Sequence, residues 1–170
     1  MHTTTAAGFI EMQVAKVVGF GRPLAPEEFR CVVLDEVSGD RHLVIEIGAG
    51  EAFYLTASLQ GRQFGRPMTG QFAAALVHGL GGQVRQVRID RLVDEAVAAT
   101  VEIDGPLGVR HIDARASDAL NLAVITTAPV FVSPEVAADG EQRRAGDSAA
   151  AGLLRLALTA PPVTVARQQD

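Results

Sequence analysis

The sequence predicts a single α+β domain with a mostly antiparallel β-sheet and helices packed on it. Patterns typical of strands and helices follow one another in the order strands, two helices, three strands, helix, strand, helix. Short turns rich in glycine and aspartate separate successive strand patterns, which favours antiparallel neighbours. The length of 170 residues suits one domain with a sizeable core.

The first third of the chain is predicted to supply three strands. Residues 1–8 are small and polar and are expected to be a disordered lead. Near-alternation of apolar residues over 9–20 favours a strand, and the glycines and proline of 21–28 predict a loop. Two β-rich runs, 29–37 and 42–47, are separated by four turn-forming residues and therefore predict a hairpin.

Two helices are expected next. One opens at Glu51, directly after a Gly-Ala-Gly sequence, and ends at Gly61. A basic loop over 62–68 leads to Thr69, the expected N-cap of the second helix. The large apolar residues of that helix repeat every four positions: Phe72, Leu76 and Leu80.

Three strands in an antiparallel meander are predicted over 84–92, 97–103 and 109–115, with turns at Asp94-Glu95 and Gly105–Gly108. Alternation places Val101 inward and Glu102 outward. It also separates Arg88 from Arg85 and Arg91, so these arginines could form either a phosphate-binding surface or a solvated edge.

The segment 109–132 reads as strand, helix, strand. Alternation puts Asp113 and Arg115 on one face of the strand, and Ser117 is the expected N-cap of the helix. That helix must end by Ala128, because Pro129 disfavours helical geometry in the residue before it. A short buried strand over 130–132 and a helix that starts after Ser133 are expected to follow.

The organisation expected is thus a lead (1–8), a domain (9–138) and a variable C-terminal tail (139–170). Residues 149–159 of the tail could form a helix whose apolar stripe covers a sheet edge within the chain or across a homodimer or higher homo-oligomer.

Composition excludes some classes of protein. The net charge of −5 argues against a general nucleic-acid coat, although a local basic site stays open. The single cysteine, Cys31, lies in an apolar run and is expected to be a buried small residue. We find neither a run of roughly 18 apolar residues nor a secretory signal in residues 1–8, and expect a cytoplasmic protein with no membrane partner.

Several segments together resemble the bifunctional nuclease family, whose domain is associated with DNA and RNA cleavage. The matching segments keep the order and spacing of that family: Leu43–Gly48 with Glu51-Ala52, Arg66-Pro67-Met68-Thr69, Ile112–Ala123, and Pro129–Val132 with Glu135-Val136. The Asp-Ala-Arg-x-Ser-Asp-Ala block within 113–119 is the most specific. The resemblance implies metal-dependent hydrolysis of phosphodiester bonds in DNA or RNA.

Two departures from the family pattern affect residues with chemical potential. The pattern usually continues with His-Asp after Arg-Pro-x-Thr, where this chain has Gly70-Gln71. It also usually has proline at the position of Ala116. The departures motivate an alternative in which a non-catalytic binding or assembly module keeps the fold after losing active-site residues.

For hydrolysis, the candidate catalytic and metal-binding residues are Asp113, Asp118 and Glu51, because Mg²⁺ or Mn²⁺ needs only one or two protein carboxylates. The candidate phosphate-binding residues are Arg66, Arg115 and Ser117.

Each of these residues also has a structural interpretation. Glu51 and Asp118 favour helix starts, and Ser117 suits a cap. Asp113 and Arg115 could simply pair with each other or with a neighbouring strand. The sequence leaves both interpretations open.

Overall fold

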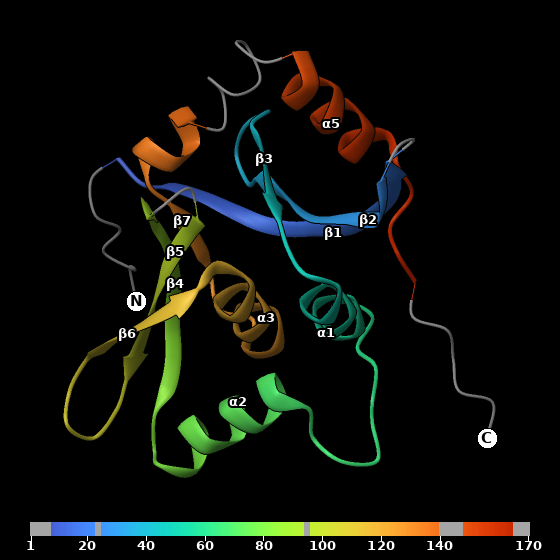
Figure 1. The fold of residues 1–170 in the computed structure, drawn as a ribbon. Helices are drawn as coiled ribbons and strands as arrows, with labels where there is room; N and C mark the ends of the chain where they lie inside the picture. Colours follow the sequence, from blue (N-terminus) through green and yellow to red (C-terminus); the bar gives the residue numbers. More distant parts are fainter. Residues whose placement is uncertain (1–7, 23–24, 94–95, 140–147, 165–170) are drawn as a thin grey trace.

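The structure, a computed structural model, describes residues 8–22, 25–93, 96–139 and 148–164. They form one curled sheet of seven strands in the order β3-β2-β1-β7-β4-β5-β6, with helices packed on it (Figure 1). All neighbours are antiparallel except β4 and β7. The predicted α+β class is confirmed.

The first half of the sheet consists of β1 (Ile10–Arg22), β2 (Ala25–Glu36) and β3 (His42–Glu46). The hairpin predicted between the last two is present. The loop predicted over 21–28 is wrong, because β1 and β2 stay paired as far as Arg22 and Ala25. A glycine in a strand has no side chain to pack, but its backbone can still form the hydrogen bonds of the ladder. The register between β1 and β2 shifts directly after Gly21.

The second half contains β4 (Gln83–Val93), β5 (Ala96–Asp104) and β6 (Arg110–Arg115), the predicted meander. In its second turn the amide of Gly108, at φ +83°, donates to the carbonyl of Gly105 at 2.9 Å. The turn predicted at 94–95 lies outside the described residues. Strand β7 (Val130–Val132) joins the halves, antiparallel to β1 and parallel to β4.

Strand β4 does not keep simple alternation. Its register against β5 shifts between Val84 and Gln86 and again between Ile89 and Arg91. Because of these bulges Arg91 pairs with Ala98 and lies on the face opposite Val87 and Ile89, beside which simple alternation would place it.

Helices α1 (Ala49–Leu59) and α3 (Ala116–Thr126) cover one face of the sheet and enclose the main core. Helix α2 (Thr69–Gly79) packs beside α3. A short helix covers 134–139, and the Ser133 hydroxyl accepts a hydrogen bond from the amide of Val136, as predicted for an N-cap.

The helix expected in the tail is present as α5 (Ser148–Thr159). It buries Ala157 against Val18, Cys31 and Val33, on the face of β1 and β2 away from the main core. The tail helix therefore covers a sheet face within the chain. Lys16 fixes its C-terminal end by donating to the carbonyls of Leu158 and Ala160.

Among the described residues, no helix is both long and apolar enough to cross a membrane.

Candidate functional site

A charged corner of the fold lies where β6 runs into α3 without a loop. Arg115 ends the strand and, with φ −69° and ψ 147°, is the N-cap residue of the helix that begins at Ala116. The prediction that Ser117 caps α3 is therefore wrong, since Ser117 is already the second helical residue. Ser117 lies inside the helix because α3 begins directly after the last residue of β6, with no connecting residue between the strand and the helix.

Arg115 joins two carboxylates from different helices. Its Nε donates to Asp118 Oδ2 at 2.8 Å and its Nη2 to Asp118 Oδ1 at 3.2 Å. Its Nη1 donates to Glu51 Oε1, in the first turn of α1, at 2.8 Å. The hydrogen bonds and charge of Asp118, with a smaller contribution from Glu51, raise the pKa of Arg115 above its ordinary value. The guanidinium group of Arg115 thus lies between two carboxylates and forms two parallel hydrogen bonds with one of them.

This corner opens into a cleft of about 540 Å³ between α1, α2, α3 and the strands β5 and β6. Glu51, Arg115, Ser117 and Asp118 lie on its wall. The remainder is mainly apolar: Ala73, Val77, Val101, Ile103, Ile112, Ala114 and Leu122. A cleft with apolar walls and a few converging charged groups is the usual form of a small-molecule or substrate site.

Two residues at the cleft were missed by the sequence analysis. Tyr54 lies one helical turn after Glu51, and Asn121 lies one turn after Asp118. Residues three apart on a helix share a face, so this spacing was the signal that could have found them.

Asp113 is not brought to this corner. Ile112 and Ala114 line the cleft, so Asp113 between them points to the other face of the sheet. There its Oδ1 lies 3.2 Å from Nη2 of Arg91, and its side chain is 80% exposed. Of the three predicted carboxylates, only Glu51 and Asp118 lie together.

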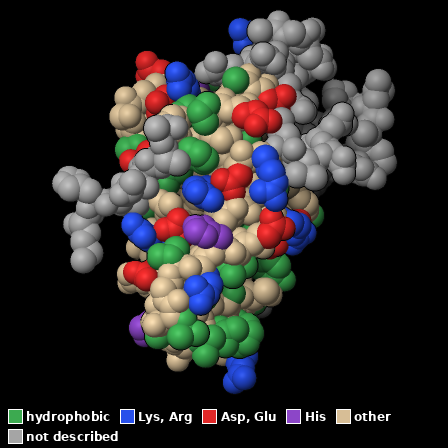
Figure 2. Space-filling view, turned by 90° about the vertical axis from the view of Figure 1, so that its left-hand side faces the viewer, with side chains coloured by type: hydrophobic (Ala, Val, Ile, Leu, Met, Phe, Trp, Pro, Cys, Tyr) green, Lys and Arg blue, Asp and Glu red, His purple; other side chains and the backbone are tan. Residues whose placement is uncertain are grey.

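The other predicted residues have separate positions. Ser117 is half-buried in the first turn of α3, whereas Arg66 is exposed on the loop between α1 and α2. Figure 2 shows acidic and basic side chains interleaved on the side of the molecule that carries β6. Each arginine of β4 lies near a carboxylate: Arg85 near Glu102, Arg88 near Asp90, and Arg91 near Asp113.

The outward face of the meander also holds a buried acid. Alternation predicts that Glu102 points outward. Its side chain does lie on the sheet face opposite to that of Val101, but the residue is only 7% exposed. Its Oε2 accepts a hydrogen bond of 2.9 Å from Gln86 and lies 3.3 Å from Nε2 of His111. Neighbouring side chains on β4 and β6 thus exclude water from a position that alternation alone would leave solvated.

Across the described part of the chain, no group of three or more His, Cys, Asp or Glu side chains is placed to hold a metal ion. Glu51 and Asp118 provide two carboxylates around one point, where the Arg115 guanidinium now lies. Hard oxygen ligands suit Mg²⁺, which takes one or two carboxylates and completes its shell with water and substrate phosphate. Glu51 and Asp118 are ligands of the type that such an ion takes, and in this structure both carboxylates accept hydrogen bonds from Arg115.

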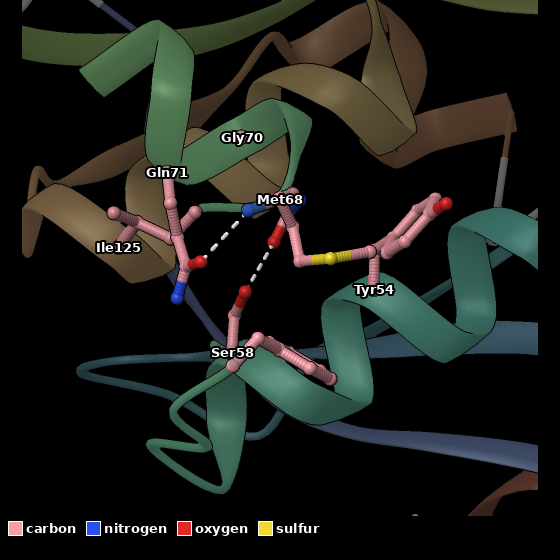
Figure 3. A pocket seen from close by; sticks show the side chains of 8 residues that line it. Tyr54, Ser58, Met68, Gly70, Gln71 and Ile125 are labelled. Atoms are coloured by element: carbon pink, nitrogen blue, oxygen red, sulfur yellow. Dashed lines mark hydrogen bonds between the residues drawn. The ribbon is translucent and has the colours of Figure 1, made fainter. Parts of the chain in front are cut away.

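Gly70 and Gln71, which stand where the family pattern has His-Asp, have structural roles (Figure 3). A Cβ on Gly70 would lie 2.7 Å from Asn121 Nδ2 and 2.9 Å from Ile125 Cδ1, so α2 approaches α3 closely here. Gln71 Oε1 accepts a hydrogen bond of 3.0 Å from the amide of Met68. Met68, and not the predicted Thr69, is the N-cap residue of α2.

The small pocket beside these residues has a volume of about 10 Å³, close to that of one water position. Ser58 donates to Asn121 Oδ1 at 2.6 Å along its wall. Gly70 lines this small pocket and also the larger cleft.

Comparison with known proteins shows the family of the chain. The family profile described as the bifunctional nuclease domain matches residues 32–144. Two uncharacterized proteins of Mycobacterium tuberculosis, from strains CDC 1551 / Oshkosh and ATCC 25618 / H37Rv, are each 32% identical over 127 residues. These alignments cover 75% of this chain and 75% of each relative. The chain belongs to the bifunctional nuclease domain family.

Proposed function

We propose that this chain is a nuclease that hydrolyses phosphodiester bonds of DNA or RNA at the open corner of the cleft. One observation carries the proposal: Glu51, Arg115 and Asp118 converge from α1 and α3 on the wall of a cleft of about 540 Å³. Membership of the bifunctional nuclease domain family supports nucleic acid as the binding partner.

Each of the three side chains has a role in this proposal. Glu51 and Asp118 would hold a Mg²⁺ or Mn²⁺ ion, and a bound ion would supply an activated water and charge neutralisation for the phosphoryl group. Arg115, 67% exposed, turns its fork from the carboxylates to the phosphate oxygens when substrate arrives. Ser117 at the start of α3 and Arg66 on the neighbouring loop contact adjacent phosphates.

A nuclease assay with matched variants tests the proposal. Purified protein is incubated with single- and double-stranded DNA and RNA, with Mg²⁺ or Mn²⁺ and with or without chelator. We expect chelator-sensitive cleavage that Glu51→Gln and Asp118→Asn each reduce by about 100-fold or more. Asp113→Asn is the matched control, because that aspartate lies on the opposite sheet face, and it should keep wild-type activity.

Two outcomes would reject the proposal. If the wild-type protein shows no chelator-sensitive cleavage of any of these substrates, the chain is not a metal-dependent nuclease. If Asp113→Asn loses activity while Glu51→Gln and Asp118→Asn keep it, the active site lies elsewhere. Thermal melting of every variant separates loss of chemistry from loss of fold.

The alternative, a non-catalytic module that retains the fold, is favoured by a specific observation. Arg115 satisfies both carboxylates within the chain, and Gly70 and Gln71 serve packing and helix capping. In this alternative the corner fixes α1 to α3. Glu51→Gln and Asp118→Asn would then lower the melting temperature, and no variant would change a cleavage rate.

A further inference from the structure

We propose that the outward face of α2 is the surface through which two copies of this chain associate. The face is formed by Phe72, Leu76 and Leu80, which are 60%, 51% and 72% exposed. No residue within α2 is buried. Leu80 immediately follows the helix, as its C-cap residue.

Helix α2 is apolar on more than one side. Ala73 and Val77 face the cleft, while Phe72, Leu76 and Leu80 form the outward face. The helix contains no Asp, Glu, Lys or Arg, and His78 is its one titratable residue. A helix that is hydrophobic all round is normally buried. Figure 1 shows α2 at the lower end of the fold, with α3 on one side of it.

The apolar surface extends beyond the helix. A Cβ on Gly81 would lie 3.2 Å from Cγ of Pro106, so the turn between β5 and β6 packs beside the end of α2. Leu107 in that turn is 82% exposed, and Ile112 on β6 is 48% exposed. Hydrophobic side chains gather at the lower end of this side of the molecule (Figure 2). Monomeric proteins rarely leave apolar patches of this kind uncovered.

The absence of charged side chains on α2 favours a protein partner over nucleic acid. Nucleic acid binds through Lys and Arg contacts to phosphate, and α2 offers neither. The centre of a protein interface is depleted in charge and rich in large apolar side chains, as this face is. A second copy of the chain presents the same uncharged face, so the two faces match without burying an unpaired charge.

The three longer segments outside the described residues do not match the face in composition. Residues 1–7, 140–147 and 165–170 include only two large apolar side chains, Met1 and Val165. The described residues that lead to these segments lie around β1: Gly8 is next to Pro134, and the amide of Val163 donates to the carbonyl of Val17. Figure 1 places α5 and helix 134–139 at the end of the fold away from α2.

The stripe suits pairing about a two-fold axis. Leu76 is its middle residue, so an antiparallel arrangement places Leu76 near its copy and Phe72 near Leu80 of the second copy. Small residues lie between the large ones, at Ala75 and Gly79, and leave grooves for the opposing side chains. The pairing is isologous and closes as a dimer.

The mass of the protein in solution, measured by sedimentation over a range of concentrations, tests the proposal. We expect a wild-type dimer, and a dissociation constant raised at least about 30-fold by Leu76→Glu. The matched control is Leu156→Glu on α5, where the leucine is also about half exposed, at 52%. It should leave the dimer unchanged. Circular dichroism of each variant monitors its fold.

A cross-linking measurement decides the case if Leu76→Glu does not fold. Leu76→Cys should form an interchain disulfide on oxidation, and Leu156→Cys should not. The native cysteine does not compete, because Cys31 is fully buried. A monomeric wild-type protein at all concentrations overturns the proposal. So does a dimer that survives Leu76→Glu, or one in which Leu76→Cys gives no cross-link.

Discussion

Arg115 donates a hydrogen bond of 2.8 Å to Glu51, 64 positions earlier in the chain, and so ties the start of α3 to the start of α1. The contact lies at the surface, with the arginine side chain 67% exposed and that of Glu51 27% exposed. Solvent and salt screen such pairs, so their contribution to stability is small. This exposure lets stability and activity be separated by mutation.

Replacing Arg115 by lysine should therefore change activity far more than stability. Lysine keeps the charge and loses the forked geometry that contacts Asp118 and Glu51 together. We expect the free energy of unfolding to fall by at most about 1 kcal/mol, measured by urea denaturation, and nuclease activity to fall by about 10-fold or more. If the wild-type protein has no nuclease activity and Arg115→Lys lowers the free energy of unfolding by more than about 3 kcal/mol, the result would instead support the non-catalytic alternative, in which the corner only fixes α1 to α3.

Local signals predicted most of the fold. Helix α1 begins at Ala49, two residues before the predicted start at Glu51, with Gly48 as its N-cap residue. Helix α3 ends before Pro129 as expected, with Thr127 in the left-handed region at φ 56°. The extent of β1 and β2 could not be predicted in this way. Their pairing as far as Arg22 and Ala25 depends on the partner strand, which outweighs the glycines within the segment.

The candidate site was only partly predictable. Asp118 lies three residues after Arg115, and helix geometry brings them together locally. Contact with Glu51 depends on the packing of α1 against α3, which no local pattern contains. Alternation put Asp113 beside Arg115, but Arg115 is also the N-cap residue of α3, and its side chain reaches the helix starts while Asp113 pairs with Arg91.

Alanine at Gly70 and at Gly50 should have opposite effects on stability. Both glycines are the second residue of their helices, α2 and α1. A Cβ on Gly70 would lie 2.7 Å from Asn121, whereas no atom lies within 4 Å of a Cβ on Gly50. We expect Gly70→Ala to lower the free energy of unfolding by about 1–3 kcal/mol through overpacking. Gly50→Ala should raise it by up to about 1 kcal/mol through helix propensity.

Thermal and urea denaturation measure both glycine variants. Equal effects of the two substitutions would contradict the close contact between α2 and α3.

Glu102 should be important for stability despite its charge. Its carboxylate accepts a hydrogen bond from the buried Gln86, and alanine would leave that amide without its acceptor. We expect Glu102→Ala to cost about 1–3 kcal/mol in urea denaturation. Asp104→Ala, on the exposed end of the same strand, is the control and should change stability by less than about 0.5 kcal/mol.

Replacing both Gln86 and Glu102 by leucine should recover part of the loss, because neither position then holds a buried polar group that has lost its partner. A double variant less stable than Glu102→Ala alone would show that the hydrogen bond is not the cause.

Cys31 should make the protein less stable at high pH. Burial, with the nearby charge of Glu46, raises the pKa of its thiol from 9.0 to about 11. The folded state therefore favours the neutral thiol. This contribution to stability is complete below pH 9, decreases as the unfolded thiol ionises, and is lost as pH rises through 11.

By pH 10 the expected loss is about 1 kcal/mol relative to neutral pH, since one pKa unit corresponds to about 1.4 kcal/mol. Urea denaturation at pH 7 and pH 10 measures it, and Cys31→Ala is the matched variant because it removes only this titration. The wild-type protein should lose about 1 kcal/mol more than Cys31→Ala between the two pH values. An equal loss in both proteins would mean that the thiol ionises in the folded state as readily as in the unfolded chain.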